Sequence, residues 1–232
     1  MKITLDGFYK SFIKDNAWMN YLDGLKMTLL ISLVATLMGI AIGLIIALIK
    51  HKYAEEKNER SVGFGLALLN TLANFYTTVI RGTPVLLQLL ILFAVVFNGS
   101  VQAAMIGFGI NSGAYVSEIF RAGLLSVDKG QSEAGRSLGL SANKTMIKIV
   151  VPQAFKNIVP SLFNEFISLI KETSVAGSIA VIELTKVAER SKSKTFLIEP
   201  LFIAAFMYLI VVVGLTQVQK VLERRLARSD RN

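Results

Sequence analysis

Charged residues stand inside otherwise apolar stretches of this chain, and they are its most distinctive chemical feature. Glu118 and Arg121 interrupt the apolar tract 101–127, and Glu165 interrupts the tract 149–170. Glu118 and Arg121 are three residues apart, so on a helix they share a face and can form an ion pair. A charge within a membrane-spanning helix is costly and usually faces the interior of a bundle or a watery cavity. These residues are therefore candidates for the path of a polar solute, with structural ion pairs as the competing interpretation.

The residue types also exclude several kinds of chemistry. The 232 residues include no cysteine and one histidine, His51, which rules out disulfides, cysteine nucleophiles and a multi-histidine metal cluster. The pattern G-x-x-x-x-G-K-(S/T) is missing, so the chain has no P-loop with which to hydrolyse ATP. The formal net charge of +9 does not indicate nucleic-acid binding, because no soluble basic module carries it.

Apolar tracts that could position these charges fill most of the chain, which is 53% hydrophobic. The uncharged run from Met27 to Ile49 has 23 residues, and a helix needs ~20 to cross the hydrocarbon core. The tract 62–98 is too long for one upright crossing, and Pro84 within it predicts a kinked or broken helix. Gly39 and Gly43 form a GxxxG helix-contact motif in the first tract.

We therefore expect an all-α, polytopic membrane protein with a single transmembrane domain over 1–232. Its five expected spans lie at about 25–49, 62–98, 101–127, 149–172 and 197–219. Residues 171–196 are expected to form a polar connection. Five spans place the termini on opposite sides, and Lys and Arg concentrate in cytoplasmic loops. The segments 50–61, 126–150 and 220–232 hold 13 Lys and Arg, against 7 on the other side, which predicts an outside N-terminus and a cytoplasmic C-terminus.

The polar loop at about 128–148 has the composition of short helices. Ser132 is a candidate helix cap, and Glu133 in the first turn would favour the positive end of a helix. We expect this helix to run from about Glu133 to Leu138 and to end at Gly139, a residue that tolerates a left-handed conformation. Ser141 is a candidate cap for a second helix that approaches the membrane and ends at Pro152. A capped helix held between two spans on the inner face predicts a docking element for another protein.

This loop resembles the EAA loop of permeases from ATP-binding-cassette (ABC) importers. The pattern EAA, three residues, Gly, nine residues, I-x-L-P is matched from Glu133 to Pro152, with Gly135 in place of the third alanine and Val151 in place of the leucine. Three further stretches are similar to the branch that carries polar amino acids. They are RGTPVLLQ at 81–88, NSGAYVSEIFR at 111–121 and NEFISLIKETS at 164–174.

The resemblance implies a type I ABC importer fold with a cytoplasmic coupling helix, in the bacterial plasma (inner) membrane. The implied partners are two ABC ATPase subunits, a second permease copy or paralogue, an extracellular or periplasmic amino-acid-binding protein and membrane lipids. ATP and Mg²⁺ would be used by the ATPase, so we expect no cofactor on this chain and no catalytic role for it. The residues expected to dock the ATPase are Glu133, Ala134, Gly135, Gly139, Leu140 and Pro152, with Ala134 and Gly135 allowing close approach.

The expected substrate is a polar amino acid. A carboxylate in a pore suits an ammonium or guanidinium group, so Glu165 favours a cationic amino acid (arginine, lysine or histidine) over glutamine or glutamate. Glu165 could instead pair with Lys156, Arg121 or Lys171. The other candidates for the substrate path are Asn164, Thr173, Ser174, Asn111, Glu118 and Arg121.

Two alternatives remain open from the sequence. An ATP-independent secondary transporter or channel subunit would be expected to contain inverted repeats with broken helices in both halves, which five spans cannot divide evenly. A membrane scaffold without transport would not need charges within its spans.

Overall fold

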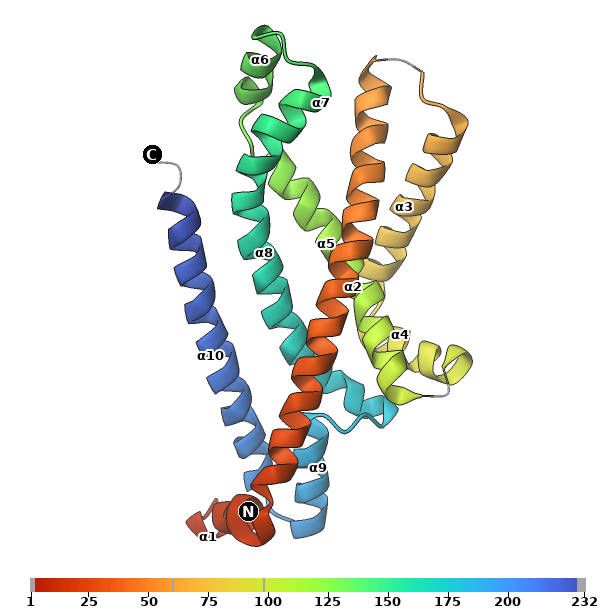
Figure 1. Cartoon of the computed structure of the whole chain (residues 1–232). Helices are drawn as coiled ribbons and strands as arrows, with labels where there is room; N and C mark the ends of the chain where they lie inside the picture. Colours follow the sequence, from red (N-terminus) through yellow and green to blue (C-terminus); the bar gives the residue numbers. More distant parts are fainter. Residues whose placement is uncertain (1–2, 60, 98, 229–232) are drawn as a thin grey trace.

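The computed structural model describes residues 3–59, 61–97 and 99–228, and these residues form helices and short connections. Figure 1 shows an elongated bundle in which α2 runs along almost the whole molecule. The α-helices are α1 (Leu5–Phe8), α2 (Trp18–Glu59), α3 (Phe64–Gly82), α4 (Val85–Ile91), α5 (Ser100–Leu125), α6 (Lys129–Ser137), α7 (Ala142–Thr145), α8 (Val151–Glu172), α9 (Leu184–Thr195) and α10 (Glu199–Arg228). Short π and 3₁₀ segments adjoin them: η1 (Tyr9–Ile13), η2 (Lys14–Asn16), η3 (Leu92–Val96), η4 (Met146–Val150) and η5 (Thr173–Ile179). The all-α fold class is thus confirmed.

Two helices of the described residues are long and apolar enough to cross a membrane by themselves, within Trp18–Lys57 and Glu199–Leu226. The pair α3 and α4–η3 makes a third if it is counted as one span, and it bends by 106° at the break. This confirms the broken helix expected from Pro84, which lies at the N-cap of α4. The helices α5 and α8 coincide with the third and fourth expected spans, but their charged residues lower their hydropathy. The count of five spans therefore stays a prediction.

The polar connection expected at 171–196 is largely helical, which the sequence analysis did not predict. This segment contains the 3₁₀ turns of η5 and the helix α9. Glu183 makes α9 possible, because its carboxylate caps the helix by accepting hydrogen bonds from the backbone N–H groups of Thr185 (2.7 Å) and Lys186 (2.6 Å). Polar composition alone did not distinguish a capped helix from a loop.

The packing of α2 against α5 is the most extensive contact between two helices in the structure. The GxxxG pair on α2 lies in this contact, as expected. A Cβ added to Gly39 would lie 2.6 Å from Ser112 Oγ, and one added to Gly43 would lie 2.6 Å from Val116 Cγ1. Real Cβ atoms do not approach so closely, so only glycine lets the two backbones come this near.

The facing helix α5 carries a second GxxxG pair. A Cβ added to Gly109 would lie 2.9 Å from Met38 Cβ, and one added to Gly113 would lie 2.7 Å from Ile42 Cγ2. Each helix thus presents glycines to the side chains of the other. The surrounding core is buried around Phe108, Ile31 and Leu89, which α5, α2 and α4 contribute.

We expect Gly43→Ala to destabilise the protein by about 1–3 kcal/mol, because the added methyl group overpacks a contact that includes the backbone of α5. Gly214→Ala is the matched control, since a Cβ at Gly214 of α10 meets nothing within 4 Å. Thermal unfolding of the purified protein in detergent measures both changes. Equal stability of the two variants would contradict the close approach of α2 and α5.

A second buried cluster joins α2, α9 and α10 near the N-terminal end of the molecule. Glu183 is fully buried and accepts a hydrogen bond from the hydroxyl of Tyr208 on α10 at 3.1 Å. The backbone N–H of Leu184 donates to Thr28 Oγ1 on α2 at 3.3 Å. Burial raises the pKa of the Glu183 carboxyl above its ordinary value, against the lowering effect of the hydrogen bonds that it accepts.

Glu183 is expected to make stability depend on pH. A carboxyl with a raised pKa contributes its stabilisation fully below its unfolded pKa of about 4.5, and this stabilisation is lost as the pH rises through the raised value. Melting temperatures measured between pH 4.5 and 7.5 should therefore fall less steeply for Glu183→Gln than for the unaltered protein. Glu189→Gln, at an exposed position of α9, is the control and should leave the slope unchanged.

Candidate functional site

A groove of about 410 Å³ lies between α5 and α8 and contains two of the predicted carboxylates. Its walls are Tyr115, Glu118, Ile119, Ala122, Gly123 and Ser126 from α5, and Asn157, Ser161 and Glu165 from α8. The two carboxylates come from different helices and have different partners. The groove therefore offers an acidic, partly polar surface inside an apolar bundle.

Glu118 is an ion-paired carboxylate. The guanidinium Nε of Arg121 donates to its Oε2 at 2.8 Å, which confirms the predicted pair. The Nζ of Lys50 on α2 lies 3.6 Å from Glu118 Oε1 and donates a hydrogen bond to Thr77 Oγ1 on α3 at 3.0 Å. This network connects α2, α3 and α5, so Glu118 serves the packing of the bundle even where it lines the groove.

Glu165 has a neutral hydrogen-bond partner. Ser112 Oγ of α5 donates to Glu165 Oε1 at 2.9 Å, and Ser112 is fully buried. Arg121, one of the ionic partners considered for Glu165, pairs with Glu118 instead. Glu165 also lines a second hollow of about 290 Å³, together with Asn164 and with Gln219 of α10. Glu165 thus stands where the two hollows meet.

The break between α3 and α4 is locked by side-chain hydrogen bonds to α5. Gln88 Nε2 donates to the backbone carbonyl of Ile80 (2.9 Å) and to Thr83 Oγ1 (2.8 Å). Asn111 Nδ2 donates in turn to Gln88 Oε1 at 3.0 Å. Asn111 is buried, and its amide donates to the Gln88 side chain at the helix break. It does not line the groove.

The break also positions a cation beside the groove. The guanidinium of Arg81 lies 5.4 Å from the centroid of the Tyr115 ring, a distance at which a cation is attracted to the ring face. Tyr115 is itself a wall of the groove. The end of α3 thereby contacts one wall of the groove between α5 and α8.

Thr173 and Ser174 lie apart from the groove. Thr173 is fully buried and donates to the carbonyl of Ile170 at 2.8 Å. Ser174 Oγ donates to the carbonyl of Lys171 at 2.8 Å, and Ser174 lines another hollow beside α9 and α10. Both hydroxyls bond their own helix backbone, as Ser and Thr commonly do. Among the predicted path residues, Glu118 and Glu165 line the groove, Arg121 pairs with Glu118, and Asn164 lines the second hollow with Glu165.

Sequence reasoning did not identify several residues of this site. Ser112 and Tyr115 stand between better-marked neighbours in the 111–121 stretch, and Gln88 ends the 81–88 stretch. Lys50 is the first charge after the uncharged run of α2, which is the one signal that could have marked it as an ionic partner.

The loop expected to dock another protein forms α6 and α7, which project from one end of the bundle (Figure 1). The helix α6 ends in the turn known as a Schellman motif: Gly139 N–H donates to Arg136 O (2.9 Å) and Leu140 N–H donates to Gly135 O (3.2 Å). Gly139 has φ +83°, which confirms the expected left-handed termination. Glu133, Ala134 and Leu138 are exposed, and Leu138 has 83% of its surface accessible.

The role expected for Gly135 needs correction. It is buried against its own chain, because a Cβ there would lie 2.8 Å from both Ile149 Cδ1 and Thr145 Cγ2. Gly135 therefore seats α6 on η4 and is not free to approach another protein. Only its exposed neighbours on α6 present a surface.

The boundaries of the loop helices also differ from expectation. Asp128 caps α6 by accepting a hydrogen bond from Gly130 N–H at 2.7 Å, so α6 starts at Lys129, four residues before Glu133. Ser141 caps α7 as expected, by accepting from Lys144 N–H at 3.4 Å. Pro152 does not end the approaching helix. It occupies the first turn of α8, where the missing N–H has no cost.

A helical bundle with charged groups within apolar tracts and a capped helix pair at one end fits the membrane-embedded subunit of a transporter. The chain belongs to the family of binding-protein-dependent transport system inner membrane components, which it matches over residues 62–228. Subunits of this family are not enzymes, since ATP hydrolysis takes place on the separate ATPase. Family membership decides against the secondary transporter, the channel and the scaffold.

Curated relatives cover nearly the whole chain. The chain is 37% identical to the arginine transport system permease protein ArtQ of Bacillus subtilis (strain 168), over 90% of this chain and 93% of the relative. It is also 37% identical to the putative glutamine transport system permease protein GlnP of Rickettsia typhi (strain ATCC VR-144 / Wilmington), over 88% and 92%. The L-cystine transport system permease protein TcyB of Bacillus subtilis (strain 168) is equally similar, at 37% over 93% and 90%.

Solved structures share the fold. The crystal structure of an amino acid ABC transporter with histidines matches with a TM-score of 0.84 at 35% identity, over 97% of this chain and 100% of that chain. An inward-facing MetNI methionine ABC transporter matches with a TM-score of 0.78 at 16% identity, over 92% and 99%, and shows the fold alone. These likenesses confirm the expected type I importer architecture.

We expect Gly139→Val to uncouple ATP hydrolysis from transport, because a β-branched residue at φ +83° is strained by about 1–2 kcal/mol and would distort the end of α6. Gly63→Val is the matched control: Gly63 has φ −63° and open space around it. The ratio of ATP hydrolysed to solute accumulated in liposomes measures coupling. Gly139→Asn should keep more coupling than valine, since Asn tolerates this conformation. Unaltered coupling in Gly139→Val would contradict a docking role for the loop.

Proposed function

We propose that this chain is the permease subunit of an ATP-driven amino-acid importer and that its translocation path runs along the groove between α5 and α8. A second copy or a paralogue would complete the path, and five spans would carry it across the plasma (inner) membrane with the N-terminus outside. The opposite placement of α1 and the C-terminal end of α10 supports this topology (Figure 1). The observation that carries the proposal is Glu165, a carboxylate lining two hollows within an apolar bundle.

The proposed substrate is a polar amino acid, with a cationic one favoured. The named relatives transport glutamine, arginine or cystine, which supports the broader class. One difference between Glu118 and Glu165 favours a cation. Arg121 and Lys50 compensate the charge of Glu118, whereas the hydroxyl of Ser112 donates a hydrogen bond to Glu165 without neutralising it. A guanidinium or ammonium group in the groove would supply the missing positive charge.

The helix α8 connects the proposed docking loop to the proposed path. One end of α8 receives α6, through the hydrogen bond from Gln153 Nε2 to Gln131 Oε1 at 3.2 Å and through the packing of Gly135 on η4. Glu165 lies farther along α8, beside α5. An ATPase subunit seated on the exposed face of α6 would therefore move the carboxylate wall of the groove whenever it moved the loop. The path would in this way open alternately to the two sides of the membrane (alternating access), driven by the ATPase at the α6 end of the bundle.

The decisive experiment compares Glu165→Gln with the unaltered protein, reconstituted in liposomes with the ATPase and the binding protein. Loss of the charge should reduce kcat/KM for arginine or lysine by about tenfold, because hydrogen bonds to charged groups contribute about 1.5–3 kcal/mol. Glutamine uptake should change little if this substrate is carried at all. Glu189→Gln, at an exposed position of α9 that lines neither hollow, is the control and should leave both rates unchanged.

Two results would overturn the proposal. An equal loss for arginine and glutamine would remove the argument for a cationic substrate. Accumulation of an amino acid without ATP would contradict the importer mechanism itself. Uptake should be tested separately for arginine, lysine, histidine, glutamine and glutamate.

A further inference from the structure

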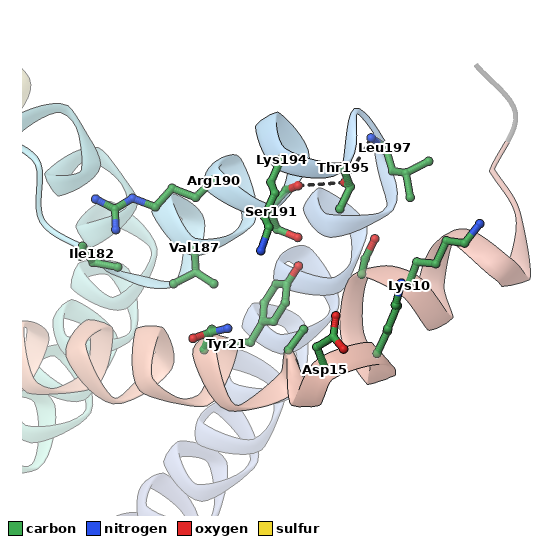
Figure 2. Close-up of a pocket in the computed structure, with 14 residues that line it drawn as sticks. Lys10, Asp15, Tyr21, Ile182, Val187, Arg190, Ser191, Lys194, Thr195 and Leu197 are labelled. Carbon is green, nitrogen blue, oxygen red and sulfur yellow. Dashed lines mark hydrogen bonds between the residues drawn. The ribbon is translucent and has the colours of Figure 1, made fainter.

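A polar pocket of about 590 Å³ lies at the end of the bundle opposite α6, between the N-terminal segment and α9 (Figure 2). Its walls come from residues 10–21, the start of α2 included, from α9 and from the connections on either side of α9. No residue of the proposed path lines it. The pocket is separate from the groove between α5 and α8 and holds none of the groups used in the proposed function.

The pocket is basic. Four of its lining side chains are cations, namely Lys10, Lys14, Arg190 and Lys194, and one is acidic, Asp15. Lys10 is ion-paired with Asp6 of the same short helical segment at 2.5 Å. Among the described residues, Lys14, Arg190 and Lys194 form no ion pair with a carboxylate. Three uncompensated charges from two separate parts of the chain therefore surround one hollow.

The pocket wall also contains two buried hydroxyl groups, those of Ser11 and Tyr21. Ser11 is 1% exposed, and its Oγ makes no hydrogen bond to any described residue. Tyr21 is equally buried, and its hydroxyl points toward Ser191. Buried hydroxyl groups are usually hydrogen-bonded, to protein, to water or to a ligand. An anion with several oxygens would accept from such hydroxyls and from the cations at once.

The pocket lies close to the lipid headgroup layer, as its position along α2 shows. The uncharged run of α2 begins at Met27, and Tyr21 precedes it by about 9 Å at 1.5 Å per residue. The headgroup layer extends about 5–8 Å beyond the hydrocarbon core on each side. The pocket thus lies just outside the headgroup layer, and the long Lys and Arg side chains can reach lipid phosphates from there, whichever side of the membrane this end faces.

An apolar groove of about 850 Å³ lies on the other face of the same N-terminal segment. Phe8, Tyr9, Phe12 and Ile13 form one wall, and α10 forms the other with side chains that include Phe206. The segment is therefore amphipathic: its polar face lines the basic pocket, and its apolar face lines a channel along a membrane-crossing helix. Aromatic side chains over an apolar groove at this level suit a lipid acyl chain.

We propose that the basic pocket binds the phosphate of an anionic phospholipid, with an acyl chain of that lipid in the groove between the N-terminal segment and α10. Lys14, Arg190 and Lys194 hold the phosphate, and Ser11 Oγ donates a hydrogen bond to it. The lipid would fix the N-terminal segment to α9 and α10 at the membrane surface. This site is independent of the proposed amino-acid path.

The test uses the full chain purified with its ATPase in detergent and titrated with phosphatidylglycerol, with bound lipid counted by native mass spectrometry. Lys194→Gln and Arg190→Gln should each weaken phosphatidylglycerol binding about fivefold, since one basic residue near the surface contributes about that factor. Lys192→Gln is the matched control, because Lys192 is exposed on the same helix and does not line the pocket. Ser11→Ala should weaken binding without lowering the melting temperature of the lipid-free protein.

Further arms distinguish the possible ligands. Phosphatidylcholine, which carries no net charge, should bind more weakly and should not respond to Lys194→Gln. Inorganic phosphate should compete poorly, because it lacks the acyl chain. Phosphate binding as strong as phosphatidylglycerol binding, or equal phosphatidylglycerol binding by Lys194→Gln and Lys192→Gln, would overturn the lipid assignment. Unchanged lipid binding with weaker docking of the binding protein would also overturn it and assign the cations to that protein. None of these outcomes bears on Glu165.

Discussion

The close approach of α2 and α5 is the constraint on which the rest of the structure depends. Glycines on both helices let the backbones meet without side chains between them, and the same approach fixes the rotation of α5 about its axis. That rotation brings Glu118 to Lys50 of α2 and turns Ser112 to Glu165 of α8. A membrane interior provides little hydrophobic force between helices, so packing of this kind has to determine their positions. The groove exists because two glycine pairs set where its walls stand.

Polar groups in the bundle divide into those that hold helices together and those left for a ligand. The network of Glu118, Arg121 and Lys50 and the contact of Asn111 with Gln88 are internally satisfied. Each joins different helices, and its hydrogen bonds offset part of the cost of removing the groups from water. Glu165 and the wall of the basic pocket are different, because their charges exceed what the described neighbours supply. Binding is expected at such places and structural roles at the others.

Much of this could be read from the sequence. The uncharged run of α2, the break at Pro84, the ion pair of Glu118 with Arg121 and the termination of α6 at Gly139 follow from local rules about length, spacing and backbone conformation. Contacts across the sequence did not follow. Nothing near Gly135 reveals that Thr145 and Ile149 cover it, and Asn111 gives no sign that its partner is Gln88. The helix α9 was missed because its cap, Glu183, is buried by α10, which lies beyond it in the chain.

The inward position of Gly135 has a consequence for how such transporters diversify. A change at this position disturbs the seat of α6 on η4 whatever protein lies outside, so it is constrained by the fold of the permease itself. Leu138 has no such internal contact to preserve, since it is almost fully exposed. If an ATPase docks on α6 as proposed, exchange of one ATPase for another could proceed through the exposed side chains of this loop, while Gly135 is kept by internal packing and carries little information about the identity of the partner.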